Sequence, residues 1–180
     1  MTSIRELTAQ EADKVTVQKT IKDSLIEFFV ELNEEILADV NDVATEIEED
    51  SFIDKLYLFD VSVNQSMIHS KWLTKLNSAK RDYRKLKEKQ DKYNLLLWKY
   101  YQGKMTLDKA REFAGTLQEH VLKSDVEKYL HADELWIIMK EATQNQYSIV
   151  EMCEQMMDAN KQRGYAIKNA IEIKKFEAGF

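Results

Sequence analysis

The sequence predicts an all-α fold built from long helices, on two observations. First, the 180 residues include no proline and only four glycines. Proline breaks helices and glycine weakens them, so their scarcity permits long uninterrupted helices and leaves few residues for the turns of β-rich folds. Second, apolar residues follow heptad spacing in two stretches, which is typical of helices that pack against one another. We therefore expect amphipathic helices in a hairpin or bundle, with further subunits covering the remaining apolar surface.

Residues 20–47 are expected to form the first long helix. Its apolar side chains recur every three or four positions, which places them on one stripe, with most acidic side chains outside it: Ile21, Leu25, Phe28, Leu32, Ile36, Val40, Val43 and Ile47. The acidic cluster at residues 46–50 is unfavourable at a helix C-terminus. The helix is therefore predicted to end there, and a new one to begin at Ser51 with Asp54 in its first turn.

The stretch 72–100 has the most regular pattern. Its seam residues are spaced alternately four and three apart over about four heptads: Trp72, Leu76, Ala79, Tyr83, Leu86, Gln90, Tyr93, Leu97 and Tyr100. Gly103 is expected to end this helix. A shorter helix is predicted over residues 106–121.

The last long helix is predicted to start at a capping box, Ser124 to Glu127, and to run to about Phe176. It carries a second heptad seam: Leu135, Ile138, Ala142, Asn145, Ile149, Met152, Met156 and Ala159. Two complementary seams joined by a short connection predict an antiparallel helical hairpin. A polar Asn145 within a seam can set helix register or oligomeric state.

Charge is strongly segregated along the chain, although the net value is −6. Residues 1–70 contain 5 Lys or Arg against 16 Asp or Glu, residues 71–123 contain 14 against 6, and residues 124–180 contain 7 against 10. The basic middle is the candidate surface for a polyanion, and the acidic front could attach to it within one subunit or between subunits. The alternative is a solvated charged face.

Patterns typical of catalysis or metal binding are absent from the sequence. His69, His120 and His131 have no partner at i, i+4, so we expect no metal site and no cofactor. Cys153 stands among methionines on a helix and is predicted to be a buried small hydrophobe. No nucleophile–base pair is visible, and no apolar run is long enough to span a membrane. A single cysteine suits a reducing cytoplasm. The sequence predicts a protein that is not an enzyme.

The basic segment predicts a surface for single-stranded nucleic acid. Between residues 71 and 104 there are 11 basic and 3 acidic residues, interleaved with aromatic ones. Lysine and arginine neutralise phosphates, and exposed aromatic rings stack on unpaired bases. Most of these aromatic residues lie on the seam, which favours core positions for them. The predicted DNA-contact set is Lys71, Lys75, Lys80, Arg81, Arg84, Lys85, Lys99, Tyr101 and Lys104.

Several short motifs resemble those of a known family. They are Ser70-Lys71-Trp72-Leu73-Thr74-Lys75, Tyr100-Tyr101-Gln102-Gly103-Lys104, Phe52-Ile53-Asp54, Leu130-His131-Ala132-Asp133, Arg163-Gly164-Tyr165-Ala166-Ile167-Lys168 and Phe176-Glu177-Ala178-Gly179. In this order they resemble the UvsY family, the recombination mediators of T-even-type bacteriophages. The resemblance covers residues 52–180. We therefore expect an acidic helical N-terminal extension, residues 1–50, before a UvsY-like domain for DNA binding and assembly, residues 51–180.

The resemblance implies a non-enzymatic recombination mediator in the cytoplasm of the infected bacterial host. Such proteins form ring-like homo-oligomers, bind single-stranded DNA and help to load the phage recombinase UvsX onto DNA covered by the phage single-strand-binding protein. The C-terminal helix is then expected to carry assembly, through Leu135, Ile138, Ile149, Met152, Met156, Tyr165, Ile167 and Phe176. One departure concerns a Lys and an Arg of the family that contribute to DNA binding, because Leu95 and Leu97 occupy those positions.

Two alternatives stay open at this point. The chain could be a coiled-coil adaptor or structural protein whose charged faces bind a protein partner. The acidic helix at residues 20–47 could imitate DNA and gate the basic surface, or it could serve in oligomerisation. Gating predicts that deletion of residues 1–50 raises DNA affinity.

Overall fold

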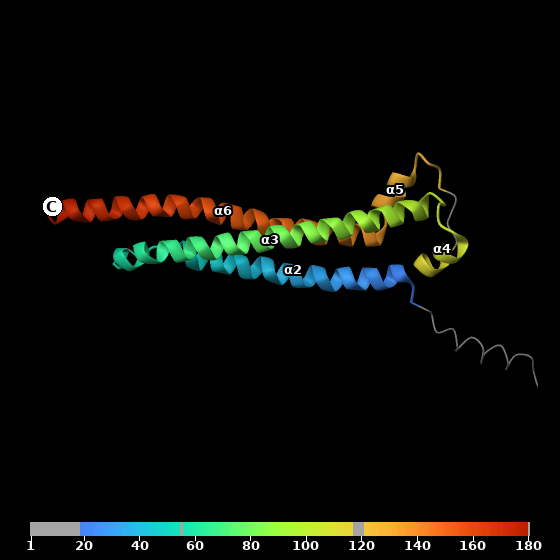
Figure 1. Ribbon diagram of the computed structural model, residues 1–180, viewed down its shortest axis with the longest axis horizontal. Coiled ribbons are helices and arrows are strands. Elements are labelled where there is room, and N and C mark those ends of the chain that lie inside the picture. The colour runs from blue at the N-terminus through green and yellow to red at the C-terminus, as the bar shows by residue number, and fades with distance from the viewer. Residues whose placement is uncertain (1–18, 55, 117–120, 180) are drawn as a thin grey trace, which may run out of the picture.

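The computed structural model describes residues 19–54, 56–116 and 121–179, and these form an elongated bundle of three long helices (Figure 1). The long helices are α2 (Ile21–Ser51), α3 (Leu58–Tyr101) and α6 (Glu134–Glu177). Two short helices, α4 (Leu107–Ala114) and α5 (Val126–His131), connect α3 to α6 at one end of the bundle. The described part of the chain contains no strand, so the predicted all-α class is confirmed.

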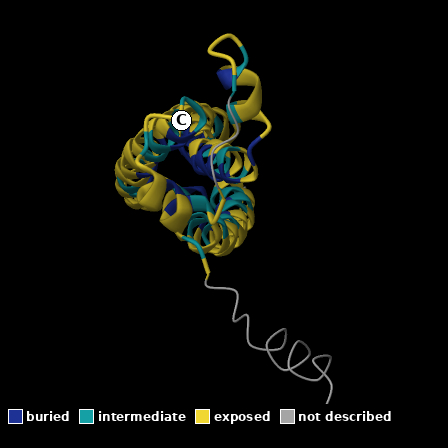
Figure 2. Cartoon of the chain, turned by 90° about the vertical axis from the view of Figure 1, so that its right-hand side faces the viewer, coloured by how far each residue is buried: buried dark blue, intermediate teal, exposed yellow. Residues whose placement is uncertain are grey.

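The two heptad seams pack against each other, as the hairpin prediction requires. Tyr101, at the end of α3, contacts Asp133 at the start of α6, whereas Gln65 contacts Asn160 far along α6, so the two helices are antiparallel. The shared core is formed by residues of both seams, among them Trp72, Ala79, Leu86, Leu97, Leu135, Ala142, Ile149 and Met156. Figure 2 shows that the buried parts of the chain, in dark blue, face the interior between the helices.

Helix α2 packs along α6 as the third member of the bundle and runs parallel to it. The Lys22 Nζ lies 2.6 Å from the Asp133 Oδ2. Farther along, the Asn145 Nδ2 donates to the Asn33 Oδ1 over 2.8 Å, so the polar seam residue binds within the subunit. The buried stripe of α2 is Phe29, Ile36 and Val43. Ile21 and Phe28, which the pattern assigns to the stripe, are 42% and 43% exposed.

The predicted break between the first two long helices is displaced. Helix α2 continues through the acidic cluster to Ser51, and α3 begins only at Leu58, so the expectation of a helix start at Ser51 is wrong. That expectation rested on the free-energy cost of placing carboxylates at a helix C-terminus. That cost is offset because Lys71 and Lys75 of α3 neutralise two of these carboxylates. The Asp54 Oδ1 instead accepts a bond from the backbone N–H of Leu56 in the connection.

The start of the last long helix also differs from the prediction. The segment after Ser124 forms only the short helix α5, whose N-cap residue is Asp125 and makes no capping bond through its side chain. Helix α6 starts anew at Glu134, and the Asp133 carboxylate accepts the backbone N–H of Leu135 as its N-cap. The capping-box prediction is therefore wrong, because a stronger cap lies nine residues downstream of Ser124.

Helix α4 is shorter than the helix predicted over residues 106–121. It ends at Gly115, whose φ of +72° lies in the left-handed region that glycine adopts without strain. Residues 117–120, the far end of the predicted helix, lie outside the described part of the chain.

Candidate nucleic-acid interface

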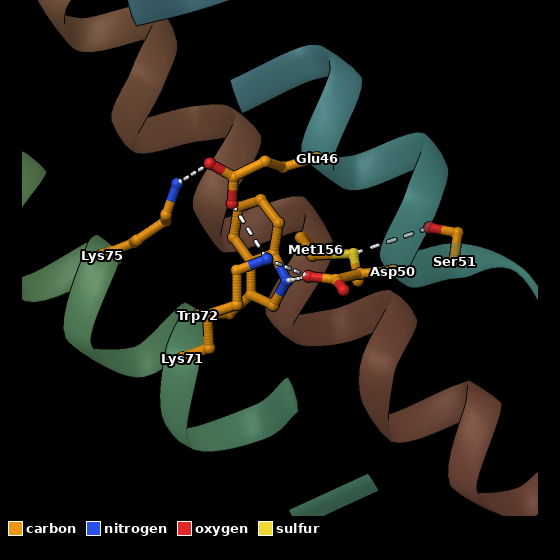
Figure 3. A network of polar contacts seen from close by, with 7 residues as sticks. All are labelled: Glu46, Asp50, Ser51, Lys71, Trp72, Lys75 and Met156. Carbon is orange, nitrogen blue, oxygen red and sulfur yellow. Dashed lines mark hydrogen bonds and ion pairs between the residues drawn. The ribbon is translucent and has the colours of Figure 1, made fainter. Parts of the chain in front are cut away.

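Two lysines of the predicted DNA-contact set, both partly exposed, are paired with carboxylates of helix α2. The Lys71 Nζ lies 2.7 Å from the Asp50 Oδ2 and 2.9 Å from the Glu46 Oε2. The Lys75 Nζ lies 2.5 Å from the Glu46 Oε1. Figure 3 shows both carboxylates reaching from α2 to the lysines on α3. We call these four side chains the α2–α3 clasp.

The buried ring of Trp72 lies beneath the clasp and orients it. Its indole Nε1–H donates to the Asp50 Oδ2 over 2.8 Å, and the Nζ atoms of Lys71 and Lys75 lie 5.7 and 5.6 Å from the ring centroid. Hydrogen bonds from Lys75 and then Lys71 lower the pKa of the Glu46 carboxyl. The bond to Asp50 raises the pKa of Lys71. Each charge therefore stabilises the charged form of its partner, and carboxylates occupy the positions that phosphates would otherwise take at these lysines.

A second group of cations follows the solvent-facing side of α3. We define the basic ridge as Arg81, Arg84, Lys85, Lys92 and Lys99, all exposed. Because an α-helix rises about 1.5 Å per residue, the ridge is about 27 Å long. Within the described structure Arg81, Lys92 and Lys99 form no ion pair, and Lys85 has only a 3.4 Å contact with Asp82. Lys92 lies outside the predicted set, although its helical phase places it on this face.

Lys80 is separated from the ridge by its partner on α6. Its Nζ lies 2.6 Å from the Glu154 Oε1, with both side chains nearly half exposed. An exposed pair of this kind contributes little stability and competes weakly with another anion.

The aromatic residue expected to contact a DNA strand is held by the protein itself. Tyr101 is half-buried, and its hydroxyl donates to the Asp133 carboxylate. Its ring contacts the rings of Tyr100 and Tyr129. At the same helix end the Lys104 Nζ lies 4.4 Å from the centroid of the Trp98 ring. A strand would therefore meet Lys99 and Lys104 more readily than the face of Tyr101.

Leu95 and Leu97, at the positions where the resemblance implies basic residues, have different environments. Leu95 is 51% exposed beside the ridge, whereas Leu97 is fully buried in the core. A cation at position 97 would therefore require a different local packing of α3.

The residues expected to form contacts between subunits fall into a buried or half-buried group and an exposed group. Leu135, Ile149, Met156 and Ile167 are buried against the chain's own helices, and Ile138 and Met152 are half-buried. Tyr165 and Phe176 are 71% and 83% exposed on the C-terminal part of α6. Those two side chains are available to another subunit.

Asp133 is the polar centre of the bundle end opposite the clasp, and in the sequence analysis it appeared only as part of a family-like motif. Its side chain is fully buried and accepts from the Lys22 ammonium of α2, the Tyr101 hydroxyl of α3 and the Leu135 backbone N–H of α6. A helix-capping signal, an aspartate before an apolar stretch, was present at this position. The long-range partners were not predictable from it.

Cys153 is fully buried, as predicted, and burial raises the pKa of its thiol. Among the residues that the structure describes, no group of three or more His, Cys, Asp or Glu side chains is arranged to hold a metal ion. No helix in the same ranges is long and apolar enough to cross a membrane.

The fold and the charge distribution together define an elongated all-helical protein that presents a cationic helix face to solvent. The chain belongs to the UvsY family, because the family model described as "Recombination, repair and ssDNA binding protein UvsY" matches residues 46–180. A curated relative, the recombination protein uvsY of Enterobacteria phage T4, is 32% identical over 142 residues, which are 78% of this chain and 98% of the relative.

Solved structures of the bacteriophage T4 recombination mediator protein UvsY have the same fold. The crystal structure in lattice type II aligns with a TM-score of 0.68 at 29% identity, over 77% of this chain and 97% of the other. The structure in lattice type I aligns with a TM-score of 0.62 at 28% identity, over 76% and 98%. The family match begins at residue 46, so most of helix α2 lies outside it.

Proposed function

We propose that this protein is a recombination mediator that binds single-stranded DNA through the basic ridge of α3. The observation that carries the proposal is the ridge itself, where five exposed cations follow one helix face and most lack a partner in the described structure. Phosphates bind such a surface with little sequence preference. Membership of the UvsY family supports the same function, since the family is described by recombination, repair and single-stranded DNA binding.

The finer features of the proposal rest on the family resemblance. The protein acts without catalysis, loads the phage recombinase UvsX onto DNA covered by the phage single-strand-binding protein, and does so in the cytoplasm of the infected host. It assembles into a ring-like homo-oligomer, with the exposed Tyr165 and Phe176 of α6 at the contact between subunits. Repetition of one ridge per subunit raises avidity for a long strand.

Replacing the ridge cations tests the proposal directly. The variant with Arg81, Arg84, Lys85, Lys92 and Lys99 all changed to Gln should lose at least tenfold in affinity for an oligonucleotide at low salt. The affinity falls as salt rises, and each lost phosphate contact makes the negative slope of log affinity against log salt shallower by about 0.7 for a single strand. Fluorescence anisotropy of a labelled oligonucleotide, titrated at several salt concentrations, measures both.

A control changes two cations outside the ridge, Lys161 and Lys128, each paired with an aspartate of its own helix or helix cap. The corresponding Gln variant should bind as the wild type does. Absence of salt-dependent binding by the wild type would refute DNA binding. Equal affinity of the ridge variant and the wild type would favour the adaptor alternative.

The α2–α3 clasp gives a separate prediction about the strength of DNA binding. Changing Glu46→Gln together with Asp50→Asn removes the two carboxylates that neutralise Lys71 and Lys75, and both changes conserve side-chain shape. The double variant should bind single-stranded DNA at least threefold more tightly at low salt, because two lysines become available to phosphates.

The control for net charge lies on the same helix. Glu48→Gln with Glu49→Gln removes the same two charges from exposed positions that contact neither lysine. A comparable gain in this control would mean that long-range repulsion, not the clasp, sets the affinity. These point variants are sharper than deletion of residues 1–50, because the deletion also removes Phe29, Ile36 and Val43 from the core.

A further inference from the structure

A groove between α3 and α6 combines the side chains that recognise an unpaired nucleobase. Its cavity measures about 410 Å³ and is lined by three aromatic residues and two lysines, Tyr83 and Lys87 from α3 with Trp136, Lys140 and Tyr147 from α6, and by uncharged polar groups that include Asn94. None of the described lining residues carries a carboxylate, and none belongs to α2. The volume lies within the range of about 300–1,000 Å³ that ligand sites occupy.

The aromatic rings of the groove are partly buried or exposed at its lining, and Tyr83 and Trp136 also pack against the core. Tyr83 and Tyr147 contact each other across the helices, with ring centroids 5.2 Å apart. Trp136 is half-buried, and the Lys140 Nζ lies 4.9 Å from its ring centroid. A flat ring that lies in the groove against Tyr147 and Trp136 meets aromatic surface and a cation together, which is the combination that stabilises stacked bases in single-strand-binding proteins.

The polar atoms of the groove suit the edge of a base. The Asn94 Oδ1 is buried and accepts no hydrogen bond within the described structure. A buried acceptor without a donor is costly, and the N–H groups on the pairing edge of a base are suitable donors. The Lys87 Nζ donates to the Gln90 Oε1 over 3.1 Å and stands 3.5 Å from Asp91, a weak exposed pair. Lys87 and Lys140 are thus available to the phosphates that flank the base.

We propose that this groove binds an unstacked base of single-stranded DNA, with Trp136 and Tyr147 as the stacking residues, Asn94 as the acceptor, and Lys87 and Lys140 on the neighbouring phosphates. The inference rests on the proposed function and adds to it a second mode of contact. The basic ridge holds phosphates only, whereas the groove makes affinity depend on the presence of bases. Arg84 of the ridge lies one helical turn from Lys87, so one strand can reach both surfaces.

The test compares two labelled strands of equal length, an oligodeoxythymidylate and an abasic strand with the same phosphates. Wild-type protein should bind the thymidylate at least tenfold more tightly than the abasic strand, because stacking is lost without bases. Changing Trp136→Leu or Tyr147→Leu should bring the two affinities together. The salt dependence should stay as in the wild type, since stacking releases no counterions.

A variant at Asn94 tests the groove without removing an aromatic side chain from the protein. Asn94→Asp keeps the shape of the side chain but places a negative charge in the groove, and it should weaken thymidylate binding more than abasic binding. Phe59→Leu removes an exposed aromatic ring elsewhere on α3 and should leave both affinities unchanged. Circular dichroism of every variant reports the helix content.

The outcomes separate the two proposals. Salt-dependent binding of both strands with equal affinity would overturn the groove and leave the ridge standing. A preference for thymidylate that survives Trp136→Leu, Tyr147→Leu and Asn94→Asp would also overturn it, because the bases would then bind elsewhere. Lack of binding to either strand would refute the proposed function itself.

Discussion

Changing Asp133→Ala should lower the free energy of unfolding by about 3 kcal/mol, among the largest single-residue effects expected in this protein. The fully buried carboxylate accepts from the Lys22 ammonium, the Tyr101 hydroxyl and the first turn of α6. Loss of an N-cap costs about 1 kcal/mol, and removal of one member of a buried ion pair costs about 3–5 kcal/mol when its partner cannot reach water. Lys22 is partly exposed, so the smaller total applies.

Thermal unfolding followed by circular dichroism measures the effect, at about 2–4 °C per kcal/mol for a chain of this size. Asp133→Asn should cost less than Asp133→Ala, because asparagine also caps helices and still accepts from a hydroxyl. Asp158→Ala removes an exposed carboxylate paired only with Lys161 and should stay within about 0.5 kcal/mol of the wild type. An Asp133→Ala protein as stable as the Asp158→Ala control would show that Asp133 does not join the three helices.

The sequence predicted the helices because the spacing of apolar residues depends on the geometry of one helix and not on which helix packs against it. The seam from Trp72 to Tyr100 needs only a spacing of three and four, and the structure confirms it. The helix ends were less predictable. Lys71 and Lys75 lie across from the acidic end of α2 and stabilise it, and this pairing brings together residues more than 20 positions apart.

The residues of the candidate interface were also only partly predictable from the sequence. The count of cations in residues 71–104 identified the basic helix, but it could not divide them between the clasp, the pair with Glu154 and the exposed ridge. That division depends on which neighbour covers each flank of α3. Likewise, Trp136 and Tyr147 lie beside a predicted seam, and only the packing of α6 on α3 brings them to one groove with Asn94.

Trp72 should show the second large effect, because it is both a core residue and the support of the clasp. Its ring is fully buried, so Trp72→Ala removes a large side chain and should cost about 3–5 kcal/mol of unfolding free energy. Trp72→Phe keeps most of the apolar contact but removes the indole N–H that donates to the Asp50 Oδ2. Chemical denaturation of both variants, with Trp98→Phe as the half-buried control, gives the two costs.

A double-mutant cycle of Trp72→Phe with Asp50→Asn then isolates the bond between the two residues. Removing a hydrogen bond to a charged group costs about 1.5–3 kcal/mol, so the two changes together should cost less than the sum of their single effects. Strict additivity would mean that the indole N–H does not hold Asp50, and that Lys71 alone fixes this carboxylate. Coupling would instead show that the buried Trp72 ring holds Asp50 in the clasp. Release of Lys71 to a phosphate would then require the hydrogen bond between Trp72 and Asp50 to rearrange.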